Sequence, residues 1–275
     1  MNLSMINTMT GMNSMQHKID QLADQIANLD TVGYKRKDPS FADVLNNRLQ
    51  QPRGFSQPGR QTPLGLSLAH GARLANNQTV WVQGSMKETE QPTDLMIRGN
   101  GVFELAPDEA GVRQFTRGGS FQLAPVADGV TRLVTSEGVP VLDVNGNVID
   151  IPSNANLRID AHGNVFATDE EGAPEGLLTT LRYVEVLNPQ LLERIGANTY
   201  RIAEVDGVRP EQVVENVDLN VNPLGEVKQG ALEMSNVDFG WTMSELLTAQ
   251  RSYALNARAL ASVDTMNGLI NNIRG

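Results

Sequence analysis

The chain has 275 residues, a formal net charge of −10 at pH 7 and no cysteine. Without cysteine, disulfides and thiolate metal sites are excluded. The acidic balance repels phosphate backbones, so we expect no nucleic-acid partner. No apolar run approaches the ~20 residues that span a bilayer, which predicts no direct membrane insertion. The first lysine is Lys18, so the N-terminus does not resemble a secretory signal, and any export would proceed without a cleaved one.

Residues 1–30 are predicted to form one helix, because apolar side chains recur there at heptad spacing. At ~1.5 Å per residue this helix would be roughly 40 Å long. The pattern stops shortly before Gly33, which suits a turn. The two series of the heptad seam are Met5, Met12, Ile19 and Ile26, and Thr8, Met15, Leu22 and Leu29.

Residues 34–75 are rich in Gly, Pro, Gln, Arg and Asn and are predicted to be an extended linker region. A short apolar group, Phe41, Val44 and Leu45, favours a brief helix within it. The basic patch Tyr34-Lys35-Arg36-Lys37 has two interpretations of about equal weight. It is either a docking contact with an acidic neighbour or a solvated helix end favoured by the helix dipole.

Residues 76–222 are predicted to form an all-β outer domain, because short apolar runs alternate there with turn signals. Leu157 and Ile159 face one way, and the polar residues between and after them face the other. Asn145-Gly146 and His162-Gly163-Asn164 are typical of hairpin turns.

Residues 235–273 return to a helical pattern, in which Leu246, Tyr253 and Leu260 are seven apart. Val263, Met266 and Ile270 continue the stripe. Alanines along this helix permit close approach of another helix. Candidate caps before it are Ser235, Asn236 and Asp238.

These elements define an α+β protein with a mostly-β middle domain and a discontinuous α-helical, coiled-coil assembly domain. The predicted boundaries are an N-terminal assembly helix at 1–33, a linker region at 34–75, the β domain at 76–222 and a C-terminal assembly helix at 223–275 that pairs with 1–33. Each helix has an apolar seam that must be covered. We expect the helices to pack on each other and on neighbouring subunits.

The sequence offers no catalytic, cofactor-binding or metal-binding constellation. His17, His70 and His162 lack partners at metal-ligand spacing. Residues 143–147 resemble the opening of a calcium loop without its closing glutamate, so a β-turn is the better interpretation. Gly99-Asn100-Gly101 is not a dinucleotide-binding fingerprint, because no third glycine or helix follows. We therefore expect a protein that is not an enzyme and has no cofactor.

Segments at both ends and in the middle of the chain resemble the flagellar rod, hook and hook-filament-junction family. Near the N-terminus the resemblance is carried by Gly11-Met12 and residues 26–36. In the middle it is carried by residues 83–86, 94–103, 115–121 and 133–138. The C-terminal segments that match are 229–238, 249–253, Asn256-Ala257 and Asp264-Thr265-Met266.

The resemblance implies a rod-type subunit, most like the distal-rod or long proximal-rod types, that polymerises helically through its terminal helices. It implies a place in the flagellar basal body, outside the cytoplasm, after passage through the flagellar type III export apparatus. Its partners would be copies of itself and other rod or hook subunits. The predicted assembly interface comprises Met5, Met12, Met15, Ile19, Leu22, Ile26, Leu29, Leu246, Gln250, Tyr253, Ala257, Leu260, Val263, Met266 and Ile270.

Two other functions stay open at this level. One is a binding or adhesin-like β module that the terminal helices dimerise. The other is an enzyme, such as a wall-cutting hydrolase with rod-like ends, which would need a catalytic site within residues 76–222.

Overall fold

The computed structural model describes residues 3–43, 46–49, 66–69, 72–127, 129–153, 155–169, 176–196, 198–203, 207, 209–220 and 225–274. The chain forms two compact units. Unit 1 contains Met1–Ala27, Lys37–Gln78 and Asp238–Gly275, and unit 2 contains Asn28–Arg36 and Thr79–Val237. Both units are therefore assembled from segments that are distant in the sequence.

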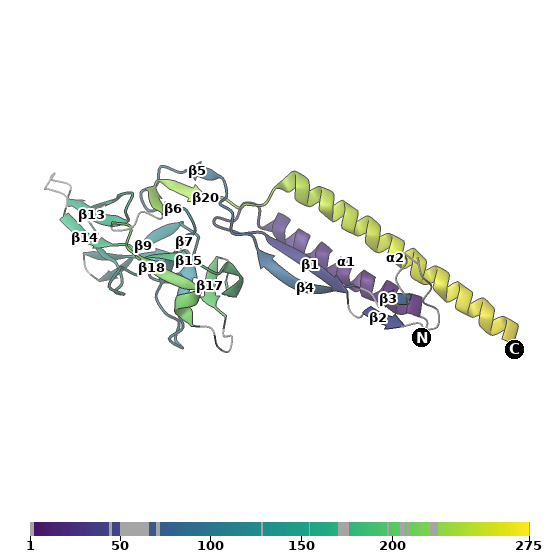
Figure 1. Ribbon diagram of the computed structural model, residues 1–275. Helices are drawn as coiled ribbons and strands as arrows, with labels where there is room; N and C mark the ends of the chain where they lie inside the picture. Colours follow the sequence, from purple (N-terminus) through teal and green to yellow (C-terminus); the bar gives the residue numbers. More distant parts are fainter. Residues whose placement is uncertain are drawn as a thin grey trace, which may run out of the picture. The chain divides into compact units, whose positions relative to one another are not determined.

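Two long helices, α1 (Leu3–Ala27) and α2 (Phe239–Arg274), pack against each other in unit 1 (Figure 1). The Lys18 ammonium lies 2.6 Å from the Glu245 carboxylate. A Cβ added at Gly11 would lie 3.4 Å from the Asn256 amide nitrogen. The earlier residue on α1, Gly11, lies beside the later residue on α2, Asn256, whereas Lys18 lies beside Glu245. The helices are therefore antiparallel. The two helical ends of the chain thus lie against each other.

The helix boundaries follow from local hydrogen bonding. The side chain of Asp238 caps α2, since its Oδ1 accepts the N–H of Trp241 at 2.8 Å. Asn236, which was a second candidate cap, serves unit 2 instead: its amide donates to the carbonyls of Val80 and Val82. Helix α1 ends at Ala27, three residues earlier than the heptad pattern predicts.

The segment predicted as an extended linker contains strands. β1 (Lys37–Asp43) pairs with β4 (Ala72–Thr79), and β2 (Asn46–Leu49) pairs antiparallel with β3 (Leu66–Ala69). The side-chain amides of Gln21 and Gln25 donate to the Lys37 carbonyl at 2.9 and 2.6 Å and so fasten α1 to β1. The brief helix predicted around Phe41 is wrong at that residue, which lies in β1. Val44 and Leu45 lie outside the described residues.

Unit 2 is built from short antiparallel strands, as the alternation of apolar and polar residues predicts. Its largest sheet has six strands in the order β16 (Leu192–Arg194), β17 (Thr199–Ile202), β8 (Gln114–Thr116), β7 (Gly101–Leu105), β15 (Tyr183–Val186), β18 (Val214–Val217). Two three-stranded sheets are β11 (Asp150–Pro152), β10 (Val130–Thr135), β9 (Phe121–Ala127) and β12 (Ala155–Ile159), β13 (Asn164–Asp169), β14 (Gly176–Thr180). The two strand pairs are β19 (Glu226–Gln229) with β6 (Leu95–Arg98) and β20 (Ala231–Glu233) with β5 (Met86–Glu88).

Aliphatic side chains dominate the core of unit 2, with a few aromatic rings at its centre. Phe103 and Phe121 meet edge to face with ring centroids 5.2 Å apart. Leu157 and Ile159 are buried, as their alternation predicts. The remaining members of this main cluster are Leu95, Ile97, Leu105, Leu133, Val141, Ile149, Ile151, Val165, Leu181, Tyr183, Leu219 and Val227.

Both predicted hairpin turns of unit 2 are confirmed. Gly146 and Gly163 have φ angles of +83° and +80°, and their N–H groups donate to the carbonyls of Asp143 and Asp160. Among the described residues, no helix is long and apolar enough to cross a membrane.

Candidate assembly interface and its buried ion cluster

One face of α2 covers α1, and we call it the inner stripe. Ala249 on this face is fully buried, and so is Leu22 on α1. The other members of the stripe are half-buried, and their spacing alternates between three and four residues, which is the geometry of a helix-pair seam. The inner stripe comprises Leu246, Ala249, Tyr253, Asn256, Leu260 and Val263.

Helix α2 also carries large apolar side chains that α1 leaves exposed, and we call these residues the outer stripe. Its members are between 39% and 63% exposed. At 3.6 residues per turn Leu247, Leu255 and Leu269 point away from the inner stripe, whereas Met243 and Met266 lie at its flanks. Phe239, seven residues before Leu246, continues the line of the inner stripe. Apolar side chains outside the face that a partner helix covers are typical of a helix that is buried on more than one side. The outer stripe comprises Phe239, Met243, Leu247, Leu255, Met266 and Leu269.

The fifteen residues predicted from the sequence to form the assembly interface divide by burial. Leu22 is buried, whereas Gln250 and Met266 are exposed. The side chain of Ile270 lies outside the described part of the structure. Leu29 belongs to unit 2, beyond the end of α1. The half-buried set is Met5, Met12, Met15, Ile19, Ile26, Leu29, Leu246, Tyr253, Ala257, Leu260 and Val263. Their contact with other subunits stays a prediction.

The predicted heptad seam does not include most of the outer stripe. It follows a single line of residues, and Met266 is the one member of the outer stripe that it contains. Phe239 continues that line one heptad before Leu246, whereas the four-residue step from Met243 to Leu247 leads away from it.

Unit 2 encloses a three-residue ion cluster, Lys35, Arg117 and Glu233. The Lys35 ammonium lies 2.6 Å from Glu233 Oε1, and Arg117 Nε lies 2.7 Å from Oε2. The three side chains are only 1–2% exposed. The Gly84 N–H also donates to Oε1, at 2.8 Å. One carboxylate therefore joins segments near residues 35, 84, 117 and 233.

Backbone carbonyls satisfy the remaining donors of the ion cluster. Arg117 donates to the carbonyls of Ile97, Gly99 and Gly101, and Lys35 donates to that of Val82 at 3.0 Å. Each nitrogen of the guanidinium thus has a hydrogen-bond acceptor although the group is buried, which offsets the cost of burying its charge.

The protonation of the cluster follows from burial and charge. Burial acts to raise the pKa of Glu233, but Arg117 and Lys35, together with hydrogen bonds, outweigh it and hold that pKa below its ordinary value. Burial lowers the pKa of Lys35, as does the charge of Arg117, and Glu233 offsets part of this. The carboxylate is therefore the charge on which both cations depend.

Backbone contacts beside the cluster require glycine at position 33. Gly33 has a φ of +72°, and a Cβ there would lie 2.7 Å from the carbonyl carbon of Arg117. Its N–H donates to the Glu233 carbonyl at 2.7 Å. Asn236 Oδ1 accepts the N–H of Arg36 at 2.7 Å. Within unit 2 the segment that follows α1 (residues 33–36) and the segment that precedes α2 (residues 233–236) therefore run side by side.

Lys35 lies in a different setting from the one that its sequence neighbours indicate. The run of basic residues predicts either a docking contact with an acidic neighbour or a solvated helix end. The structure buries Lys35, and its acidic neighbour is Glu233 of the same chain. One feature of the sequence could have indicated this cluster: Lys35, Arg117 and Glu233 each lie in a segment that carries the family resemblance.

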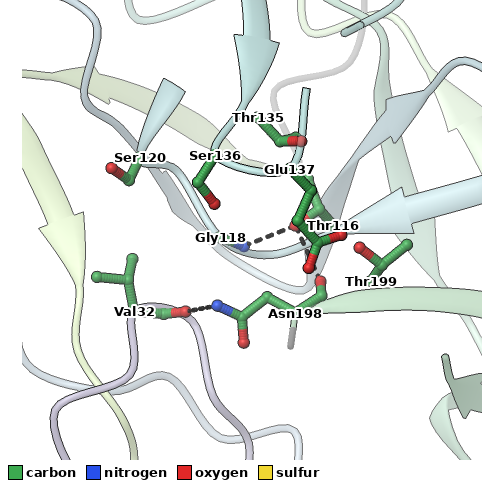
Figure 2. A pocket seen from close by; sticks show the side chains of 9 residues that line it. All are labelled: Val32, Thr116, Gly118, Ser120, Thr135, Ser136, Glu137, Asn198 and Thr199. Atoms are coloured by element: carbon green, nitrogen blue, oxygen red, sulfur yellow. Dashed lines mark hydrogen bonds between the residues drawn. The ribbon is translucent and has the colours of Figure 1, made fainter. Parts of the chain in front are cut away.

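A polar hollow lies beside the cluster in unit 2 (Figure 2). Its hydroxyls and amides mainly fasten the backbone: Thr116 Oγ1 donates to the Asn198 carbonyl at 2.9 Å, and the Asn198 amide donates to the Val32 carbonyl. The nine residues that line it are Val32, Thr116, Gly118, Ser120, Thr135, Ser136, Glu137, Asn198 and Thr199.

Residues 143–147 form a turn, and the described histidines are exposed. Asp143 Oδ1 accepts the N–H of Asn147 at 2.7 Å, which confirms a β-turn at residues 143–147. His17 and His162 are exposed, and His70 lies outside the described residues. In the part of the chain that is described, no group of three His, Cys, Asp or Glu side chains is placed to hold a metal ion.

Paired terminal helices with apolar side chains left exposed, in a chain with a β-rich second unit, are typical of a structural protein. Comparison with known proteins agrees. Residues 228–273 match the model of the flagellar basal body rod FlgEFG protein C-terminal, and residues 96–167 match that of the flagellar hook protein FlgE/F/G D1 domain.

Full-length relatives extend this match to nearly the whole chain. The chain is 35% identical to the flagellar hook-basal body complex protein FlhP of Bacillus subtilis, over 98% of this chain and 99% of that protein. It is 30% identical to the flagellar basal-body rod protein FlgG of Borreliella burgdorferi, over 96% of both. It is also 30% identical to FlgG of B. subtilis, over 95% of both. The chain belongs to the flagellar basal-body rod and hook family.

Proposed function

We propose that this chain is a structural subunit of the bacterial flagellar basal-body rod, which polymerises helically through its terminal helices and forms part of the drive shaft. The observation that carries the proposal is the outer stripe of α2. Six large apolar side chains of α2 remain 39–63% exposed although α1 covers the inner stripe. Burying them against neighbouring copies would release apolar surface from water.

The kind of contact favours a filament over a closed dimer. The inner stripe is already occupied by α1 of the same chain, so neighbouring copies must use a different surface. A contact between two different patches continues into a helical polymer when its rotation does not close a ring. The names of the relatives, a basal-body rod protein and a hook-basal body complex protein, support a rod or hook subunit over an adhesin-like module.

The partners follow from this role. We propose copies of the same chain and other rod or hook subunits as direct neighbours, and the flagellar type III export apparatus as the route out of the cytoplasm. Within the chain, residues 1–33 and 223–275 supply the assembly segments. The protein acts by assembly and not by catalysis.

Charged substitution of the outer stripe tests the proposal. The doubly substituted chain Leu247→Asp, Leu255→Asp replaces the native gene, and swimming and the length of rods in purified basal bodies are measured. Leu247→Met serves as the matched control because it keeps an apolar side chain of similar volume. We expect the double variant to lack completed rods and the control to swim normally. Normal swimming with complete rods in the double variant would overturn the proposal.

The monomer must stay folded for this test to be informative. Both leucines are exposed, at 45% and 63%, so their replacement leaves the packing between α1 and α2 intact. The purified double variant should keep the helical circular dichroism of the unsubstituted protein. A loss of helix would assign the defect to folding, and the single variants would then be compared in its place.

A further inference from the structure

Helix α2 continues past the beginning of α1. The close approach of Gly11 to Asn256 fixes the antiparallel pairing at one level. Extended residue for residue, it places Leu3, where α1 begins, opposite Asp264. The last turns of α2, residues 265–274, therefore reach about 15 Å beyond α1 at ~1.5 Å per residue. We call residues 265–274 the overhang.

The overhang is poorly suited to stand alone in water. Met266 and Leu269 are 59% and 63% exposed. Its sequence, Thr-Met-Asn-Gly-Leu-Ile-Asn-Asn-Ile-Arg, contains a glycine and three asparagines, which are weak helix formers. It has no charged residue before Arg274. Such a segment gains helical stability mainly by packing an apolar face.

The other end of the helix pair presents a complementary surface. Extending the pairing from Lys18 and Glu245 places Ala27, the end of α1, level with the beginning of α2. There is no overhang at that end. Phe239, Trp241 and Met243 in the first turns of α2 are nevertheless 39–54% exposed. We call these three residues the apolar start.

We propose that the overhang of one copy packs against the apolar start of α2 in the next copy. This rests on the proposed function and specifies which surfaces meet along the polymer. At one end of the helix pair α2 continues alone. At the other end the two helices stop at the same level and apolar side chains are exposed, so identical copies can interlock. The negative C-terminal pole of one α2 then lies beside the positive N-terminal pole of the next, which is a favourable arrangement of helix dipoles. The contact joins different patches, so it adds further copies and forms a filament when its rotation does not close a ring.

The cysteine-free chain permits a direct test. Met266→Cys is combined in turn with Phe239→Cys, Trp241→Cys or Met243→Cys, and intact basal bodies are treated with a mild oxidant and separately with a short bismaleimide. We expect at least one pair to give a ladder of dimers, trimers and higher multimers on non-reducing gels. Positions 243 and 266 are about 35 Å apart along one helix, so a cross-link between them joins two copies.

Control variants define the result. Each single-cysteine variant should remain monomeric, and Met266→Cys combined with Leu178→Cys, which is exposed in unit 2, should give no ladder. If Met266→Cys prevents rod formation, Leu269→Cys replaces it. Complete rods in which none of the three pairs cross-links would overturn the inference and leave the proposed function standing. Complete rods in cells whose chain carries Leu247→Asp and Leu255→Asp would instead overturn the proposed function.

Discussion

The ammonium of Lys35 lies 2.6 Å from the carboxylate of Glu233, although the two residues are 198 positions apart. Arg117 binds the other oxygen of the same carboxylate. The ion pairs between these side chains therefore join three distant segments of unit 2. The predicted β domain at 76–222 contains Arg117 but neither Lys35 nor Glu233. Produced alone, it would bury a guanidinium without its counter-ion, so the stable fragment must include both flanking segments.

Removing the shared carboxylate should strongly destabilise unit 2. Glu233→Gln leaves two buried cations without a counter-charge, and we expect a loss of about 3–5 kcal/mol in the free energy of unfolding. The measurement is urea unfolding followed by Trp81 fluorescence in a Trp241→Phe background. The control is Glu226→Gln, whose ion pair with Arg98 is about half exposed and should cost less than ~1 kcal/mol. Equal losses in the two variants would contradict this account of the cluster.

Acid should weaken unit 2 through the same group. Because the pKa of Glu233 is below its ordinary value of 4.5 in the folded state, the unfolded chain takes up a proton first as the pH falls. The stabilisation is therefore complete above about pH 4.5 and is lost as the pH falls through the folded-state pKa. Lys35→Met removes one of the two cations and should make the acid dependence shallower. The free energy of unfolding measured from pH 7 to pH 3 tests this, and parallel curves for the two proteins would contradict it.

Alanine at position 33 should be far more costly than alanine at another glycine of similar backbone conformation. Gly33 and Gly111 have φ angles of +72° and +77°. A Cβ at Gly111 meets nothing within 4 Å, whereas one at Gly33 meets the backbone of Arg117 and Gly118 at 2.7–2.8 Å. Gly111→Ala should cost about 1–2 kcal/mol for the left-handed conformation. Gly33→Ala should exceed that cost because the backbone of unit 2 must also move, and denaturant unfolding of both variants compares them directly.

A charge in the seam between the terminal helices should stop assembly without unfolding unit 2. Ile26→Asp and Leu260→Asp each place a carboxylate on a half-buried position of the helix pair. We expect loss of swimming, a reduced helical signal, and an unchanged unfolding transition of unit 2 reported by Trp81. Leu260→Met, which keeps the seam apolar, is the matched control. Normal swimming in both charged variants would show that the helix pair is not needed for assembly.

Periodicity alone was enough to predict the architecture. Heptad spacing located both helices, and apolar alternation located the strands of unit 2, because each pattern reports a local choice of which face is buried. The ends of α1 and α2 were less predictable. Asp238 and Asn236 are both good capping residues, and only the carbonyls of Val80 and Val82 decide that Asn236 serves unit 2.

Residues whose role depends on distant partners could not be assigned from the sequence. Lys35 within a run of basic residues is indistinguishable from a solvated cation until Glu233 is known to lie beside it. Strands β1 and β4 pair across a long interval, and β1 shows no clear alternation because Pro39 and Ser40 interrupt it. The outer stripe was visible in principle, but one helix was assumed to have a single apolar face.

The ion cluster can form only after the chain has been synthesised as far as Glu233. A ribosome must synthesise Glu233 before Lys35 and Arg117 acquire their counter-charge, so a nascent or prematurely terminated chain holds two cations that it cannot bury. At ~5–20 residues per second, roughly ten seconds or more separate the synthesis of Lys35 from that of Glu233. Throughout that interval unit 2 stays open to proteases and chaperones. Fragments made from a nonsense codon upstream of position 233 should therefore be degraded and should not accumulate as folded, assembly-poisoning pieces.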